Sequence, residues 1–291
     1  MSPPPAPRKA RRSFTKVAPS YIQLAAAVDF RNYDDASRSV STQELIGRGS
    51  FGAVYRVLLV KVKEDEKDEV AALKVQPMPF DDMGDKRCAI YRYIKSRVCE
   101  VTNLPTSPAS LVVCKRVWWS NDNHLYTLMS LCEGVSTRAV AENNAFTEAH
   151  AWGLLADVGQ ALMHLHTHDL LFNDVKPENI QMTVGAGATP RAKFALVDLD
   201  SITCTRPGSL ATDTDRTGVY EAPETMNGAA TSTSDVYSLG LSVRHLTAKI
   251  QRRSEELEQL LTIMSAQDQT ERPTLAHIID LALMHLQQQQ Q

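Results

Sequence analysis

Apolar residues recur along residues 147–168 at the spacing of an α-helix. The apolar positions that fall on one face are Ala151, Leu154, Leu155, Val158, Leu162 and Leu165. Such a stripe predicts a long helix packed against the core. The same segment carries His164, His166 and His168. Side chains two residues apart diverge on a helix, so we expect surface and capping histidines rather than a metal site.

Three shorter segments have the composition of strands. Residues 53–60 (AVYRVLLV) are apolar and rich in β-branched residues, and 70–75 (VAALKV) and 124–131 (HLYTLMSL) are short, mostly apolar runs. The charged run 61–69 predicts a solvated loop between the first two strands. Cys132-Glu133-Gly134 ends the third strand and predicts a linker. The pattern therefore favours an α+β protein with a strand-rich first part and a helical second part.

Composition changes this picture little. A chain of 291 residues with 43% apolar residues is long enough for one large domain or for two lobes that share a cleft. The net charge of −3 gives no reason to expect nucleic acid or a membrane as the main partner. Five scattered cysteines without a CxxC pair disfavour a zinc site or a disulfide framework and favour a reducing compartment.

The two ends of the chain differ from the rest. Residues 1–40 begin with four prolines among the first seven residues and five Lys or Arg but no acid in the first twenty, which predicts a disordered extension. It could dock an acidic partner, carry a nuclear import signal or simply be solvated. Residues 287–291 are all Gln, and we expect them to be unstructured. The start lacks the apolar core of a secretory signal, so we expect a cytoplasmic or nuclear protein.

Residues 172–180 (FNDVKPENI) hold the densest candidate chemistry. Asp174 can accept a proton from an attacking hydroxyl, Lys176 can neutralise charge on a transferring phosphate, and Asn179 can offer an oxygen to a metal. These are the groups that phosphoryl transfer needs, because its catalysis is mostly positioning and electrostatic stabilisation. The structural alternative is a polar turn between two strands.

Two further segments fit this chemistry. Residues 44–60 place Gly47, Gly49 and Gly52 between two predicted strands, where a tight hairpin can approach phosphates without Cβ clashes. Strands on both sides argue against a dinucleotide-binding unit. Lys74 lies inside an apolar strand, where an unpaired ammonium is costly, so it either binds phosphates or snorkels at a strand edge.

Along the chain the three glycines come first, then Lys74, then residues 172–180. This order resembles the eukaryotic protein kinase family, and the resemblance covers about residues 40–285. Further matches carry the resemblance: Asp198 stands at the family's metal-binding Asp-Phe-Gly, EAPE at 221–224 matches Ala-Pro-Glu, and SDVYSLG at 234–240 resembles Asp-x-Trp-Ser-x-Gly. ERPT at 271–274 supplies an arginine that could pair with Glu224.

The resemblance implies a bilobal fold. A small β-rich N-lobe with one main helix is expected over 41–130, and a larger helical C-lobe over 131–286. A hinge is expected near Ser130–Glu133. A small-molecule kinase, such as a choline or aminoglycoside kinase, is a weaker alternative because it does not predict EAPE together with the Asp235 helix.

The resemblance also implies the site residues. Lys74 would orient the α- and β-phosphates of ATP, Asp174 and Lys176 would act on the substrate hydroxyl and the γ-phosphate, and Asn179 and Asp198 would hold Mg²⁺. Adenine would bind near the hinge, with Met129 as gatekeeper. The residues expected around the nucleotide are Ile46, Gly47, Gly49, Ser50, Phe51, Gly52, Val54, Ala72, Lys74, Met129, Leu131 and Cys132.

Two departures lie in the catalytic and metal-binding loops. Phe172-Asn173 replaces the family's His-Arg, and Asn173 cannot pair with a phosphate as the arginine does. We therefore expect activation without phosphorylation of residues 201–217. Asp200 replaces the glycine of Asp-Phe-Gly; it either binds an extra metal or, as we expect, is accommodated in an αL-like turn or turned to solvent.

The other departures concern the partner of Lys74 and the activation segment. A helix over residues 85–99 should supply a glutamate to Lys74, but the usual position holds no acid. Either Asp85 or Glu100 substitutes, or Lys74 lacks this partner, which would favour a pseudokinase scaffold. Arg216 replaces the glycine expected before Thr217.

Lys176 and Thr217 favour transfer to serine or threonine. Residues 116–136, 162–180 and 230–243 also resemble the Wee family, which phosphorylates and inhibits cyclin-dependent kinases. The sequence therefore predicts a serine/threonine protein kinase that uses ATP and Mg²⁺, with a pseudokinase and a Wee-like kinase of a cell-cycle kinase as alternatives. Its protein substrate and oligomeric state stay open.

Overall fold

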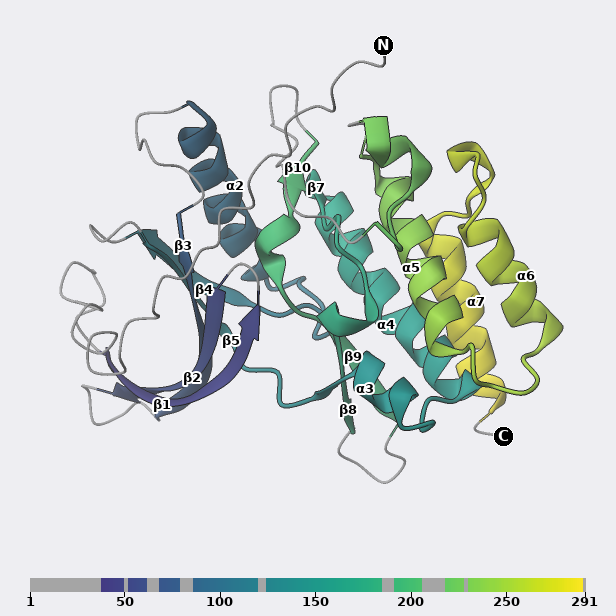
Figure 1. Cartoon of the computed structure of the whole chain (residues 1–291), viewed down its shortest axis with the longest axis horizontal. Helices are drawn as coiled ribbons and strands as arrows, with labels where there is room; N and C mark the ends of the chain where they lie inside the picture. The colour runs from purple at the N-terminus through teal and green to yellow at the C-terminus, as the bar shows by residue number, and fades with distance from the viewer. Residues whose placement is uncertain are drawn as a thin grey trace, which may run out of the picture.

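The computed structural model describes residues 38–49, 52–61, 68–78, 86–119, 124–184, 191–205, 218–227 and 230–289. A strand-rich N-lobe and a helical C-lobe lie on either side of the connection at 131–134 (Figure 1). This confirms the bilobal α+β fold predicted from the sequence.

The N-lobe is built on one antiparallel sheet of five strands in the order β1-β2-β3-β5-β4. Its strands are β1 (Arg38–Gly49), β2 (Gly52–Lys61), β3 (Glu69–Pro77), β4 (Cys114–Trp119) and β5 (His124–Ser130). Because β3 is central and covered on both faces, every residue from Ala71 to Gln76 is buried. Lys74 is therefore held inside the sheet.

The main N-lobe helix, α2 (Lys86–Thr102), bridges the two lobes. Its buried residues Ile94, Val98 and Val101 join the same core cluster as Ala72 and the C-lobe helices. α2 therefore packs between the sheet and the C-lobe, beside the loop that follows β9 (Ala192–Leu196; Figure 1).

The C-lobe is built around α4 (Glu148–His166), whose predicted apolar stripe is completely buried. Thr147 caps the first turn by accepting from the His150 backbone N–H. α7 packs so closely that a Cβ on Gly159 would lie 2.9 Å from Ile279 Cγ1. The other helices are α3 (Thr137–Glu142), α5 (Ser232–Leu246), α6 (Glu255–Met264) and α7 (Leu275–Gln288), with 3₁₀ turns η2 (Pro177–Asn179), η3 (Leu199–Ser201), η4 (Pro223–Asn227) and η5 (Gln269–Glu271).

Two small sheets position the loops that carry the candidate chemistry. They are β6-β8-β9, made of Val135–Ser136, Ile180–Val184 and Ala192–Leu196, and β7-β10, made of Leu170–Leu171 and Thr203–Cys204. The loop 172–179 joins β7 to β8, and the loop after β9 starts where Leu196 pairs with Ile180. Strand pairing therefore brings these two loops side by side.

Both predicted chain-end boundaries shift slightly. β1 begins at Arg38, inside the extension expected over 1–40, while residues 1–37 lie outside the described part. α7 continues to Gln288, so the predicted unstructured tail is wrong at Gln287 and Gln288 because glutamine is a good helix former. No helix in the described ranges is long and apolar enough to cross a membrane.

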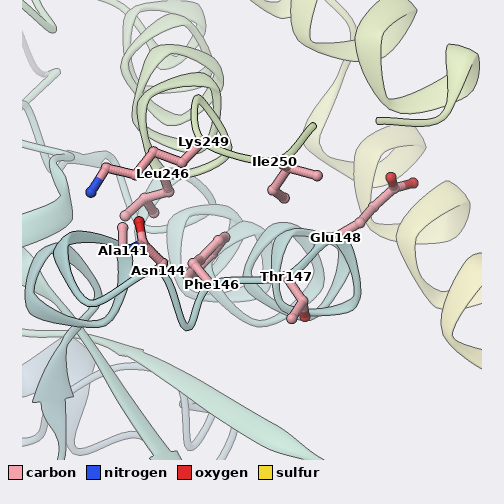
Figure 2. A pocket seen from close by; sticks show the side chains of 8 residues that line it. All are labelled: Ala141, Asn144, Phe146, Thr147, Glu148, Leu246, Lys249 and Ile250. Carbon is pink, nitrogen blue, oxygen red and sulfur yellow. The ribbon is translucent and has the colours of Figure 1, made fainter. Parts of the chain in front are cut away.

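A cavity of about 280 Å³ lies in the C-lobe, away from the candidate site (Figure 2). Its lining residues are Ala141, Asn144, Phe146, Thr147, Glu148, Leu246, Lys249 and Ile250. Its charged groups are already bonded: Lys249 Nζ donates to the Glu142 carbonyl, and Glu148 accepts from Ser254. Both charged side chains that line the cavity therefore already have hydrogen-bond partners within the protein.

Candidate active site

The loop between β7 and β8 brings its three predicted functional residues together. Lys176 Nζ lies 2.7 Å from Asp174 Oδ2, and Asn179 Nδ2 donates to the same oxygen at 2.8 Å. Burial raises the pKa of Asp174, although hydrogen bonds from Lys176 and Asn179 act against this rise. A carboxylate of raised pKa accepts a proton more readily, as a general base must.

Asp235, at the start of α5, accepts hydrogen bonds from the backbone of this loop. It is 1% exposed and accepts from the backbone N–H groups of Phe172 at 2.9 Å and Asn173 at 2.8 Å. His166 Nε2 lies 2.8 Å from the same carboxylate, and His164 is buried against the Val101 carbonyl. The expectation of surface histidines is therefore wrong for these two, because they face inward to bond buried polar groups.

Asn173 links the catalytic loop to the start of the activation segment. Its backbone has φ 63°, a left-handed conformation that asparagine tolerates better than most residues. Its Nδ2 donates to the carbonyls of Leu171 at 3.1 Å and Ser201 at 3.0 Å, and to Thr203 Oγ1 at 2.8 Å. The amide therefore fastens η3 and β10 to β7 without a phosphate.

Lys74 extends from β3 to two acids of the loop that follows β9. Its Nζ lies 2.7 Å from Asp198 Oδ1 and 2.6 Å from Asp200 Oδ2. Burial works against the charged lysine, but attraction to Asp200 and then to Asp198 raises the pKa of Lys74. Lys74 is therefore a paired, charged lysine, and the strand-edge alternative is wrong.

Asp200 is not turned to solvent, contrary to expectation. Its side chain is 12% exposed, and its second oxygen, Oδ1, lies 3.0 Å from Lys95 Nζ of α2. Burial opposes its ionisation, but Lys95 and Lys74 lower the pKa of Asp200 to about 2. Because each oxygen already contacts an ammonium, this carboxylate is poorly placed to bind an extra metal.

Of the two acids that could substitute as the partner of Lys74, Glu100 does not. Glu100 has a side chain that is 64% exposed and pairs with Arg97 at 2.6 Å, and Asp85 lies outside the described residues. Sequence reasoning missed Lys95, whose signal was a lysine four residues after Tyr91 on the inward face of α2. Without Lys95, sequence reasoning had no partner for the Oδ1 oxygen of a buried Asp200 carboxylate.

Asp198 and Asn179 fit the chemistry of a magnesium site. Asp198 has φ 65° and ψ 81°, and its side chain is 35% exposed despite its contact with Lys74. Asn179 uses its amide nitrogen on Asp174, which leaves its oxygen for a cation. Among the described residues no group of three or more His, Cys, Asp or Glu could hold a metal. Mg²⁺ needs fewer, since it keeps waters and binds substrate phosphates.

The predicted adenine-binding residues lie around one end of the sheet. Met129 is buried opposite Ala72 on adjacent strands, and both belong to the main core, against which Val54 and Leu131 pack. Cys132 follows on the connection and is half-buried. Their contacts with adenine stay predictions.

The glycine hairpin is described only in part. Ser50 and Phe51 lie outside the described residues, and Ile46 is 46% exposed. Gly47 and Gly49 end β1, and they pair with Val54 and Gly52. Gly52 has φ 154°, and a Cβ there would lie 2.3 Å from the Val75 carbonyl oxygen, so this position requires glycine.

The predicted pair of Glu224 and Arg272 is confirmed. Arg272 Nη1 and Nη2 donate to the two Glu224 oxygens at 2.6 and 2.9 Å. The guanidinium is fully buried and also lies 4.8 Å from the centroid of the Tyr237 ring. Arg216 and Thr217 lie outside the described residues.

Known proteins with similar sequences include kinases of several kinds. The chain is 30% identical over 207 residues to the membrane-associated tyrosine- and threonine-specific cdc2-inhibitory kinase wee-1.3 of Caenorhabditis elegans. This alignment covers 71% of the chain but 28% of that relative. It is 26% identical over 236 residues to calcium-dependent protein kinase 13 of Arabidopsis thaliana, covering 80% of the chain and 41% of that relative. It is 28% identical over 224 residues to serine/threonine-protein kinase PknD of Mycobacterium tuberculosis, covering 75% and 31%.

The chain thus spans less than half the length of each of these relatives. Its residues 40–251 match the family model described as the protein kinase domain. This range contains the glycine hairpin, Lys74, the loop with Asp174, and Asp198. The chain therefore belongs to the protein kinase family, with a weaker likeness to its Wee-type members.

Proposed function

We propose that the protein is an ATP- and Mg²⁺-dependent protein kinase that transfers the γ-phosphate of ATP to serine or threonine hydroxyls of a protein substrate. The observation that carries this proposal is the contact of Lys74 Nζ with Asp198 Oδ1 at 2.7 Å, between residues 124 positions apart in the chain. The backbone N–H of Val197 donates to the Asn179 carbonyl at 2.9 Å, which holds the Asp198 loop against the Asp174 loop.

In this proposal each charged group acts at one stage of transfer. Lys74 orients the α- and β-phosphates. The substrate hydroxyl oxygen attacks the γ-phosphorus, the bond to the β-phosphate oxygen breaks, and ADP leaves with that electron pair. Asp174 accepts the hydroxyl proton, and Lys176 stabilises negative charge on the transferring group. Asn179 and Asp198 would hold Mg²⁺, which neutralises phosphate charge when bound.

The pseudokinase alternative loses its strongest argument. That argument was a Lys74 with no acidic partner besides the metal-binding acid. Asp200 provides such a carboxylate at 2.6 Å, which supports retained positioning of Lys74. The Asn173 side chain likewise bonds Ser201 and Thr203, at the start of the activation segment, without phosphorylation.

A second proposal concerns the substrate. The C. elegans relative is named as a membrane-associated tyrosine- and threonine-specific cdc2-inhibitory kinase, and its alignment covers 71% of this chain. We propose that the substrate is a cell-cycle kinase, which places the protein in the cytoplasm or nucleus. Lys176 favours a threonine or serine acceptor on that substrate, and tyrosine is the competing outcome.

The test is turnover of the purified chain with ATP and Mg²⁺, using a cyclin-dependent kinase and peptides with a single Ser, Thr or Tyr. Asp174→Asn should lower kcat about 10²–10⁴-fold, as expected for loss of a general base. ATP should still raise the melting temperature of this variant. The matched control, Asp268→Asn, makes the same change at an exposed acid that precedes η5.

Each outcome decides one part of the proposal. Equal phosphate transfer by wild type and Asp174→Asn would exclude the proposed mechanism. ATP binding without turnover would favour the pseudokinase. Phosphate found on tyrosine alone would overturn the assignment to serine and threonine.

A further inference from the structure

α2 has no acid that can pair with Lys74. Glu100 is its only acidic residue, and it lies in the last turn, exposed and paired with Arg97. The inward face of α2 carries Tyr91 and Lys95 instead, and Lys95 is 3% exposed. A buried ammonium on this helix requires an acid from another element.

Asp200 supplies that acid and serves two lysines at once. Oδ2 contacts Lys74 at 2.6 Å and Oδ1 contacts Lys95 at 3.0 Å. Lys95 Nζ also donates to the carbonyls of Leu199 and Asp200, each at 3.3 Å. Lys95 therefore holds both the backbone and the side chain of the loop that carries Asp198.

Neighbouring side chains complete the cluster. Lys95 Nζ lies 5.3 Å from the centroid of the Tyr91 ring. With its amide nitrogen turned toward Asp200, Gln76 donates to Oδ2 at 3.0 Å and accepts from the Tyr91 hydroxyl at 3.3 Å. Asp200 is therefore surrounded by donors, as a buried carboxylate must be.

Charge balance links the two unusual residues. The cluster contains two ammonium groups, Lys74 and Lys95, and two carboxylates, Asp198 and Asp200. An acid added at position 200 would be uncompensated if α2 still carried one, and a lysine on α2 would be uncompensated if position 200 were glycine. The charges of the cluster therefore balance only when Asp200 and Lys95 are both present.

We propose that Asp200 is the positioning residue for Lys74, and that the Lys95–Asp200 pair couples α2 to the loop that carries Asp198. The role of Asp200 in turnover rests on the kinase function proposed above. Loss of Lys95 would remove the bonds from α2 to the Asp200 side chain and to the backbone of this loop. The position of α2 thereby controls Lys74 and Asp198 together, through an acid on the loop rather than on the helix.

Two measurements on the full chain test this proposal. In Asp200→Gly and Lys95→Met, amide hydrogen exchange over residues 88–101 should rise at least about tenfold, because the bonds between α2 and the loop are lost. The kcat of Asp200→Gly should fall about 10–100-fold, because Lys74 loses its alignment with the phosphates. Glu100→Gln, which breaks only the exposed pair on α2, should change neither.

A rescue variant separates positioning from general damage to the fold. Tyr91→Glu in the Asp200→Gly background returns an acid to α2 and restores two lysines and two acids. Its kcat should recover at least about fivefold over Asp200→Gly, whereas Tyr91→Glu alone should not exceed wild type. If Asp200→Gly does not fold, the isosteric Asp200→Asn replaces it in every arm.

The outcomes distinguish this proposal from the proposed function. Exchange and kcat within about twofold of wild type in Asp200→Gly would overturn the positioning role. A normal exchange rate in Lys95→Met would overturn the coupling. If the wild type has no turnover, the kinase proposal fails, yet the exchange of nucleotide-free protein still decides whether Lys95 and Asp200 couple α2 to the loop.

Discussion

Asp235 and Asp200 are both buried carboxylates that hold loops of the candidate site, but their partners differ in kind. Asp235 accepts from two backbone N–H groups of the catalytic loop and contacts His166. Asp200 contacts two lysine ammonium groups, one from β3 and one from α2. The first acid fixes the course of the chain, and the second connects side chains of separate elements.

This difference explains why only one of them occupies its expected place. A bond to a backbone N–H depends on the path of the loop, so moving the Asp235 carboxylate would require a different loop. A bond to a lysine depends only on where the tip of a flexible side chain lies. The acid opposite Lys74 can therefore lie on the loop instead of the helix, provided a lysine on α2 balances it.

The C-lobe pair of Glu224 and Arg272 should give the largest loss of stability when broken. Glu224→Gln leaves a fully buried guanidinium without its carboxylate, which should lower the free energy of unfolding by about 3–5 kcal/mol. Urea unfolding at pH 7 measures this. A loss below about 1 kcal/mol would contradict the view that the C-lobe acids hold the fold.

The pKa of Glu224 predicts that the stability contributed by this pair depends on pH. Burial alone would raise the pKa of Glu224, but hydrogen bonds from Arg272 and Ser234 lower it below the ordinary 4.5. A lowered pKa in the folded state gives stability that is complete above pH 4.5 and is lost as pH falls through the folded value. The stability difference between wild type and Glu224→Gln should be constant from pH 7 to 5.5 and should shrink below pH 4.5.

Asp235→Asn should have the next largest effect and directly contrasts the two acids. The new amide presents an N–H₂ to a backbone N–H inside the core, so the free energy of unfolding should fall by about 2–3 kcal/mol. Asp200→Asn should cost less, because Asp198 stays 2.7 Å from Lys74 and the Leu199 and Asp200 carbonyls still accept from Lys95. Paired unfolding curves measure both, and equal losses would remove the contrast.

Much of the fold followed from periodicity and spacing. The stripe from Ala151 to Leu165 predicted α4, and the short apolar runs predicted β3 and β5. These patterns succeed because burial of one face largely determines each element. The pairing of Glu224 with Arg272 came from family resemblance, and the structure confirmed it.

The Lys74 site shows where sequence reasoning stopped. Asp200 looked unfavourable alone, Lys95 went unnoticed, and the chain places them 105 residues apart. No local rule joins two residues at that separation; only the packing of α2 against the loop does. His166 was likewise misassigned. The periodicity of a helix predicts which face points inward, but not which buried polar group that face contacts.

The smallest expected effect comes from Asn173, where side chain and backbone can be separated. Asn173→Ala removes the amide that bonds Ser201 and Thr203 and also places alanine at φ 63°. Asn173→Gly removes the same amide without the left-handed strain, which costs about 1–2 kcal/mol for alanine.

We therefore expect Asn173→Gly to lower the free energy of unfolding by about 1 kcal/mol and Asn173→Ala by about 2 kcal/mol, measured by urea unfolding. Proteolysis near residues 201–205 should increase equally in both, because both lose the bonds to η3 and β10. Equal stability of the two variants would show that strain at Asn173 is negligible. Unchanged proteolysis would show that its amide does not hold residues 201–203, and that the pairing of β7 with β10 is enough to hold them.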